Sequence, residues 1–217
     1  MKKNILVKYL LIMFLIWINP VFSQKDNQGG HKEIRLGFNY GRAKQETFPF
    51  NSPDYQYDTQ FYKVQINYEL INKTKWRFEL NVEPAYYLAM HKLLNKYYVT
   101  PDYREDYLEK REEFTKEKNI NEYVLNIGFL SRYKIYKGIS TYALVSVGPM
   151  YSDTDTERMN AGFAFSDIFA LGISYEMKRY LFDFRYGLRH VSNANIRKPN
   201  NGYNSAGFEL GITYQIN

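Results

Sequence analysis

Alternation with a period of two runs through most of this chain and constrains its fold more than any other feature. Large apolar side chains alternate with polar, charged or small ones in eight successive runs, as in β-strands that have two different faces. In one run the apolar set is Trp76, Phe78, Leu80 and Val82, and the polar set is Arg77, Glu79, Asn81 and Glu83. The runs cover residues 34–41, 62–70, 76–83, 122–133, 139–149, 163–177, 180–188 and 208–216. We therefore expect an all-β fold with eight antiparallel strands.

The composition of the two faces distinguishes a membrane barrel from a soluble one. A soluble lipocalin-like barrel or a sandwich also alternates, but it points its large apolar side chains inward. That orientation would bury arginine, glutamate, aspartate and asparagine side chains in an apolar interior, where each is costly unless it is paired. The opposite orientation gives a polar lumen and sets the aromatic face against lipid, which suits an aromatic share of 18%. The sequence therefore predicts an eight-stranded transmembrane β-barrel of the bacterial outer membrane.

The connections between the runs alternate in length. Longer connections at 42–60, 88–120, 150–161 and 193–205 alternate with short ones at 71–75, 134–138 and 178–179. Outer-membrane barrels have this arrangement, with short periplasmic turns and long extracellular loops. Both termini are therefore expected on the periplasmic side.

The first residues predict export. Three lysines within residues 1–8 precede an apolar run over residues 9–17, and a proline and small residues follow it. This is the pattern of a signal peptide cleaved between Ser23 and Gln24, whereas a membrane anchor would need about 20 apolar residues. We expect a signal peptide at residues 1–23, a flexible lead-in at 24–32 and the barrel at 33–217.

Composition argues against several classes of function. Removing residues 1–23 takes away three lysines and no acidic residue, so the formal net charge falls from +6 to +3, which does not favour nucleic acid as a partner. The chain has no cysteine, so neither disulfides nor thiolate metal sites are available. No histidine or acid cluster has ligand spacing and no glycine-rich loop could bind phosphates, so we expect neither a metal nor a cofactor.

One histidine is placed where it could do chemistry. His31 and His91 lie outside the predicted strands, but His190 and Ser192 continue the apolar face of the seventh run toward its extracellular end. Residues two apart on a strand point the same way, so the two side chains lie close together. Serine with histidine is the minimal pair of nucleophile and base, although a polar pair at headgroup level is also an ordinary feature of such barrels. A site on the outside of the barrel is accessible only to a membrane lipid.

Residues 184–216 resemble the C-terminal signature of the lipid A 3-O-deacylase (PagL) family. The matching elements are the core at His190, Ser192 and Asn193, the step from Pro199 to Asn200, Gly202, and a closing amphipathic strand. The resemblance implies an outer-membrane esterase that removes the acyl chain at the 3 position of lipid A, with Ser192 as nucleophile and His190 as base. It also implies that Asn193 donates to the oxyanion, together with a backbone N–H that follows it.

The sequence departs from the family pattern at the residue that orients the histidine. The family has an acid there, whereas this chain has Asn204, which can orient an imidazole but cannot compensate the charge of the imidazolium. Asp167 offers a carboxylate, because a two-residue turn at 178–179 would place it opposite His190 on the neighbouring strand. We expect Asn204 or Asp167 to orient His190, unless a bulge shifts the register and leaves Asp167 solvated at the rim. Glu209 points into the lumen by the same parity.

Lipid A, as lipopolysaccharide in the membrane, is the partner that these features favour. Arg197, Lys198 and Arg158 are candidate ligands for its phosphates, as are cations in the charged loop at 90–119, although such a loop is more simply explained as a solvated one. The competing interpretation is a non-catalytic barrel, with a structural or interaction role, whose site has lost its acid. The sequence leaves both a monomer and a homodimer open.

Overall fold

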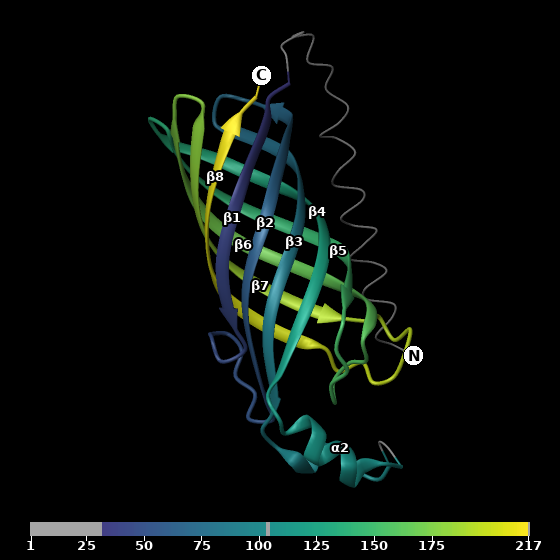
Figure 1. Ribbon diagram of the computed structural model, residues 1–217. Helices are drawn as coiled ribbons and strands as arrows, with labels where there is room; N and C mark the ends of the chain where they lie inside the picture. Colours follow the sequence, from purple (N-terminus) through teal and green to yellow (C-terminus); the bar gives the residue numbers. More distant parts are fainter. Residues whose placement is uncertain (1–31, 103–104, 217) are drawn as a thin grey trace, which may run out of the picture. The chain divides into compact units, whose positions relative to one another are not determined.

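A computed structural model describes residues 32–102 and 105–216 of the chain (Figure 1). Eight long strands make up most of it. They are β1 (Ile34–Lys44), β2 (Tyr55–Asn72), β3 (Trp76–Leu93), β4 (Lys118–Tyr136), β5 (Ile139–Ser152), β6 (Gly162–Met177), β7 (Tyr180–Ser192) and β8 (Tyr203–Gln215). Between β3 and β4 lie a short 3-10 helix, η1 (Lys96–Tyr98), and the helix α2 (Tyr107–Phe114).

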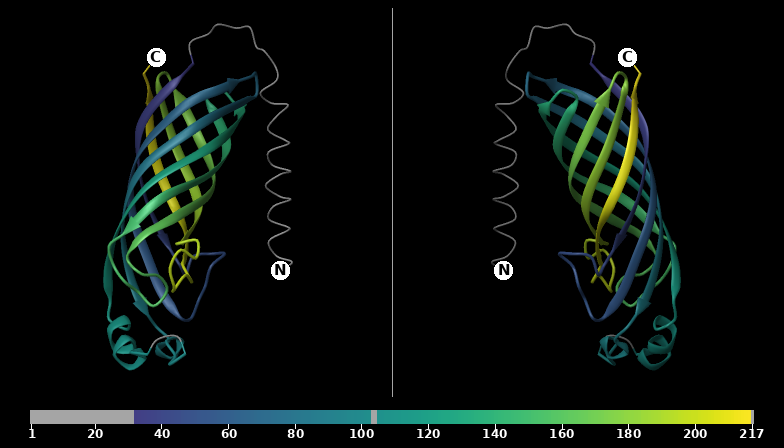
Figure 2. Two further views of the ribbon diagram at one scale, coloured as in Figure 1. Left: turned by 90° about the vertical axis from the view of Figure 1, so that its right-hand side faces the viewer. Right: turned by 90° about the vertical axis from the view of Figure 1, so that its left-hand side faces the viewer.

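The strands form one closed antiparallel barrel in sequence order, with β1 paired to β8 (Figures 1 and 2). Turns at 73–75, 137–138 and 178–179 join strands at one end, where β1 begins and β8 ends. The longer connections at 45–54, 94–117, 153–161 and 193–202 lie at the other end. This is the predicted fold class, and the alternation of long and short connections is confirmed. Among the helices of the described residues, none is both long and apolar enough to cross a membrane.

The apolar faces of the strands point outward, as the composition of the two faces predicts. Phe182 and Phe184 of β7 are 41% and 47% exposed. Arg185 and Arg189, on the other face of the same strand, are 3% and 4% exposed. The same contrast holds around the wall, where rings of neighbouring strands contact one another on the outside, as Phe184 and Phe208 do with a centroid distance of 5.5 Å. The outer surface of the barrel is therefore apolar and its lumen is polar.

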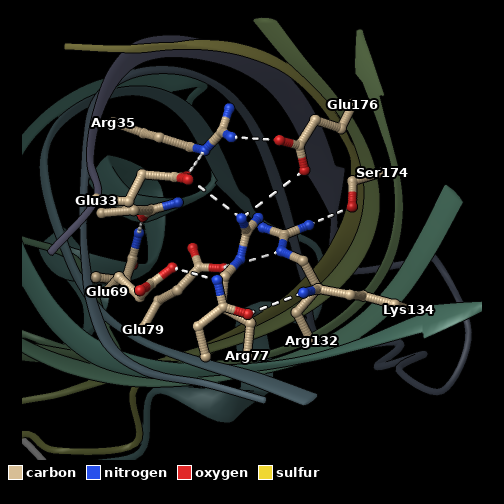
Figure 3. A network of polar contacts seen from close by, with 12 residues as sticks. Glu33, Arg35, Glu69, Arg77, Glu79, Arg132, Lys134, Ser174 and Glu176 are labelled. Atoms are coloured by element: carbon tan, nitrogen blue, oxygen red, sulfur yellow. Dashed lines mark hydrogen bonds and ion pairs between the residues drawn. The ribbon is translucent and has the colours of Figure 1, made fainter. Parts of the chain in front are cut away.

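Ion pairs fill the lumen. Lys63 contacts Glu209 at 2.9 Å and Glu83 at 3.3 Å, and Arg185 bonds the same two carboxylates, so Glu209 faces the lumen as predicted. Nearer the short turns, Arg132 donates to Glu79 at 2.9 Å and lies 3.4 Å from Asp183. Figure 3 shows this second network, in which Arg77 also donates to Glu79 and Arg35 to Glu33 and Glu176. The buried charges thus compensate one another.

The alternation reverses at the end with the long loops. There Tyr57, Tyr87 and Tyr203 point inward and are at most 1% exposed, whereas Gln56 and Asp58 face outward. A cluster of buried apolar residues forms at this end, and its largest rings, Tyr57 and Tyr203, stack with centroids 4.5 Å apart. The second, third and fourth strands therefore extend beyond the predicted runs, the third by ten residues, because the prediction assumed one apolar face along the whole of each strand.

The connection between β3 and β4 has a small core of its own. Leu93, Val99 and Phe114 are buried together, and α2 lies over them. Hydrogen bonds from Lys110 and Lys118 hold the pKa of the Glu113 carboxyl at about 2. The described part of this charged segment is thus partly helical and has a small buried core.

Two predicted segments lie outside the described residues. They are the signal peptide at 1–23 and nearly all of the lead-in at 24–32, and both stay predictions.

Replacing Arg132 with methionine should destabilise the barrel. Methionine is of similar length but uncharged, so Glu79 and Asp183 lose the cation that they share. Removing one partner of a buried ion pair typically lowers the free energy of unfolding by about 3–5 kcal/mol. Thermal unfolding in detergent micelles, followed by circular dichroism, should show a lower midpoint. Arg42→Met on the outer wall is the control, and equal midpoints for the two variants would contradict the proposed importance of the network.

Candidate active site

His190 and Asn204 form a hydrogen-bonded pair on the outside of the barrel. His190 lies near the end of β7 that leads into the long connection at 193–202, directly opposite Asn204 of β8. Its Nδ1–H donates to the Asn204 Oδ1 at 2.8 Å. The bond fixes the plane of the imidazole and leaves Nε2 as the nitrogen that can accept a proton. The loop before β8 passes close to the ring, since Cε1 lies 3.5 Å from where a Cβ on Gly202 would be.

Ser192 is the last residue of β7, two positions beyond His190 on the same face. It is half-buried, and Phe165 of β6 is its register partner. In the part of the chain that the structure describes, Ser192 makes no hydrogen bond to His190. Two residues along a strand correspond to about 6.6 Å between Cα atoms, so the two side chains are neighbours on the same face.

Asp167 occupies the predicted place on the other side of His190. The two residues are register partners across β6 and β7, as the two-residue turn requires. The carboxylate is exposed on the outer wall, and it makes no hydrogen bond or ion pair with any described residue. The imidazole is therefore held by Asn204, while Asp167 stands beside it without bonding it.

Asn193 organises the loop that follows the serine. Its side chain is fully buried and donates to the Arg197 carbonyl at 2.8 Å and to the Pro199 carbonyl at 3.2 Å. Its N–H donates to Asn200 Oδ1 at 2.7 Å. Ala194 and Asn195 then adopt a left-handed backbone with φ of 51° and 63°, and their N–H groups make no hydrogen bond to any described residue. The donors beside Ser192 that are not already engaged are thus backbone groups.

The three predicted phosphate ligands have different surroundings. Arg197 and Lys198 are exposed in the loop between β7 and β8. Arg158, in contrast, donates to the Gly202 carbonyl at 2.5 Å and to the Asn201 carbonyl at 3.1 Å. Its guanidinium is engaged with the neighbouring loop, so only the first two present their charge freely to the outside.

Several contacts near the site escaped the sequence reasoning. His91 lies inside β3, not outside the strands as expected, and its Nε2 is 2.8 Å from Glu157 in a buried pair. The Tyr186 hydroxyl, on the outer face of β7, donates to the Phe48 carbonyl of the loop at 45–54. These partners come from different loops, so no local pattern could have indicated them. No cluster of three or more histidine or acidic residues that could hold a metal ion exists within the described ranges.

Comparison with protein families identifies the chain. A family model described as lipid A 3-O-deacylase (PagL) matches residues 32–213. The chain belongs to this family. The match spans nearly the whole barrel and includes His190, Ser192 and Asn204, whereas the sequence resemblance rested on the last two strands alone.

Solved structures related to this member of the PagL family are outer-membrane barrels. The crystal structure of the outer membrane enzyme PagL superimposes with a TM-score of 0.53 at 11% identity, over 82% of this chain and 97% of that one. Neisserial surface protein A aligns over 86% of this chain and all of its own at 11% identity and a TM-score of 0.49. Ail of Yersinia pestis aligns over 85% and 97% at 11% identity and a TM-score of 0.42.

At these identities the structural similarity shows the fold alone. No curated protein sequence matches the chain. Family and fold together give a PagL-family barrel of the outer membrane, so the membrane and its lipid A are the surroundings in which the site lies.

Asn193→Ala should loosen the loop between β7 and β8. The substitution removes two donors to carbonyls at the far side of the loop, and each lost bond typically costs about 1 kcal/mol. Limited trypsin digestion followed by mass spectrometry should then show faster cleavage after Arg197. Asn72→Ala, at the end of β2 next to a short turn, is the control, and unchanged cleavage after Arg197 in Asn193→Ala would contradict this role.

Proposed function

We propose that this protein is an outer-membrane esterase that hydrolyses the acyl ester at the 3 position of lipid A, with Ser192 as nucleophile and His190 as base. The hydrogen bond from His190 Nδ1 to Asn204 carries the proposal, because it leaves Nε2 for the hydroxyl of a serine on the same face. The position of the pair on the apolar outer wall supports a lipid substrate, since that surface is open to the membrane and closed to the lumen.

The first half of the reaction forms an acyl-enzyme. Ser192 Oγ attacks the ester carbonyl of the substrate while its proton passes to His190 Nε2. The tetrahedral intermediate then collapses, the bond to the sugar oxygen breaks, and the imidazolium returns the proton to that oxygen. The products of this half are the 3-hydroxyl of the sugar and an acylated Ser192.

Water completes the reaction. His190 takes a proton from a water molecule, the hydroxide attacks the acyl-serine, and a fatty acid leaves as Ser192 recovers its proton. Across both halves one ester and one water give one alcohol and one fatty acid, with no metal or redox cofactor in the scheme.

The oxyanion needs donors next to Ser192. The N–H groups of Ala194 and Asn195 suit this role, because they follow Ser192 closely and make no hydrogen bond to any described residue. Asn193, the donor implied by the family, would have to break its hydrogen bonds to the loop before it could bind the oxyanion. We therefore assign it a supporting role, in which it holds the backbone of Ala194 and Asn195 in place.

The imidazolium that forms during catalysis carries a charge that Asn204 cannot compensate. We assign this compensation to Asp167, the register partner of His190 on its opposite flank, since the Cβ atoms of such cross-strand partners lie about 5 Å apart. Asn204 then sets the orientation of the ring and Asp167 supplies the negative charge. Arg197 and Lys198 are suitably exposed to pair with phosphates of the substrate. The short turns, the start of β1 and the end of β8 face the periplasm in this arrangement.

Ser192→Ala should abolish deacylation. Mass spectrometry of lipid A from cells that express the protein should show loss of one acyl chain with the native sequence and an unchanged acyl pattern with the variant. His190→Gln should match Ser192→Ala. Equal acyl patterns for the native protein and Ser192→Ala would refute the esterase and favour a non-catalytic barrel.

Asn204→Asp should raise kcat, because a carboxylate both orients the ring and stabilises the imidazolium. We expect an increase of about tenfold or more, since each 1.4 kcal/mol of transition-state stabilisation is tenfold in rate. Asp167→Asn, of equal size, should lower kcat in the native background and have a smaller effect beside Asn204→Asp. Rates on purified lipid A in micelles measure both, and an unchanged kcat for Asp167→Asn would remove Asp167 from the mechanism.

A further inference from the structure

The backbone next to Asn204 has lost its neighbouring strand. β1 pairs with β8 only as far as Ala206, opposite Lys44, and then turns away into the loop at 45–54. The N–H of Asn204 on that side would have no partner, and an unpaired buried amide is costly. The Tyr55 hydroxyl accepts it at 3.3 Å, so a side chain from β2 takes the place of the missing strand.

Arg158 holds both that tyrosine and the start of β8. Its guanidinium lies over the Tyr55 ring at 4.1 Å from the centroid and over Tyr98 of η1 at 5.5 Å. It donates to the carbonyls of Gly202 and Asn201, and its own carbonyl accepts the Asn201 N–H at 2.9 Å. One side chain therefore joins three of the four connections at this end of the barrel to the first residue of β2, next to the strand position that bonds His190.

We propose that Arg158 is a positioning residue that, through Tyr55 and the backbone of residues 201–204, fixes the Asn204 amide against His190. The contacts form a continuous path: Arg158 on Tyr55, the Tyr55 hydroxyl to the Asn204 N–H, and the Asn204 Oδ1 to the Nδ1–H of the imidazole. The inference deepens the proposed esterase and depends on it only for the kinetic readout.

This role differs from the phosphate binding that the sequence favoured for Arg158. A guanidinium between two rings with its donors on two carbonyls has little left for an anion. A phosphate ligand would affect binding of substrate, whereas a positioning residue affects the chemical step. The two roles thus predict opposite effects on KM and kcat.

The first experiment reads the imidazole directly and needs no activity. Nitrogen NMR of the Ser192→Ala protein in micelles distinguishes a ring protonated at Nδ1 from a mixture of tautomers, and His190→Gln identifies the signals. We expect one tautomer, protonated at Nδ1, to become a mixture in Arg158→Met and in Tyr55→Phe. Arg179→Met, at the opposite end of the barrel, should leave the signals unchanged.

Tyr55→Phe makes the test robust, because it removes a single hydroxyl and keeps the ring beneath Arg158. An unchanged tautomer in both variants would overturn the proposal. If the two variants show mixed tautomers but the native protein leaves lipid A intact, the positioning role is supported and the esterase is refuted. The two failures are therefore distinguishable.

The second experiment separates positioning from binding. In the protein with Ser192 intact, Arg158→Met and Tyr55→Phe should lower kcat by about tenfold or more while KM changes less than about twofold. The reason is that a misplaced base slows the chemical step and not the binding of substrate. A raised KM with native kcat would instead assign Arg158 to substrate phosphate and overturn the proposal.

Discussion

Mutual neutralisation of charge inside the lumen is the constraint on which the rest of this structure depends. Once the aromatic faces meet lipid, most inward side chains near the short turns are polar, and many are ions that are almost fully buried, beside a small apolar cluster that includes Leu130, Leu144 and Ile168. Such ions are tolerated only when each meets a counter-ion and further hydrogen bonds. The networks around Glu79 and around Glu83 and Glu209 meet this condition, and they hold the strands that carry the site at a fixed register.

Much of this fold could be predicted because the bilayer imposes one simple rule on each strand. Residues that alternate between lipid and a polar lumen have a strong periodic signal, and it correctly indicated eight strands, their outward faces and the pairing of Asp167 with His190. The rule does not hold above the membrane. There Tyr57 and Tyr87 turn inward to form an apolar cluster, so the strands continue beyond the point where the expected pattern ends.

The site divides in the same way. His190 and Ser192 were found from parity on a single strand, and Asn204 from the spacing of a family signature. The residues that hold them could not be found so, because Tyr55 comes from β2 and Arg158 and Asn200 from two different connections, and their proximity depends on the closed barrel. The carbonyl contacts of Arg158 could not be predicted for a related reason: a cation in a loop suggests a free charge until its partners are known.

The stacked tyrosines at the end with the long loops have a consequence for the permeability of the barrel. Tyr57 and Tyr203 lie face to face across the mouth of the barrel, and ion pairs occupy the lumen below them. Water and small solutes therefore find no continuous pore through the described barrel.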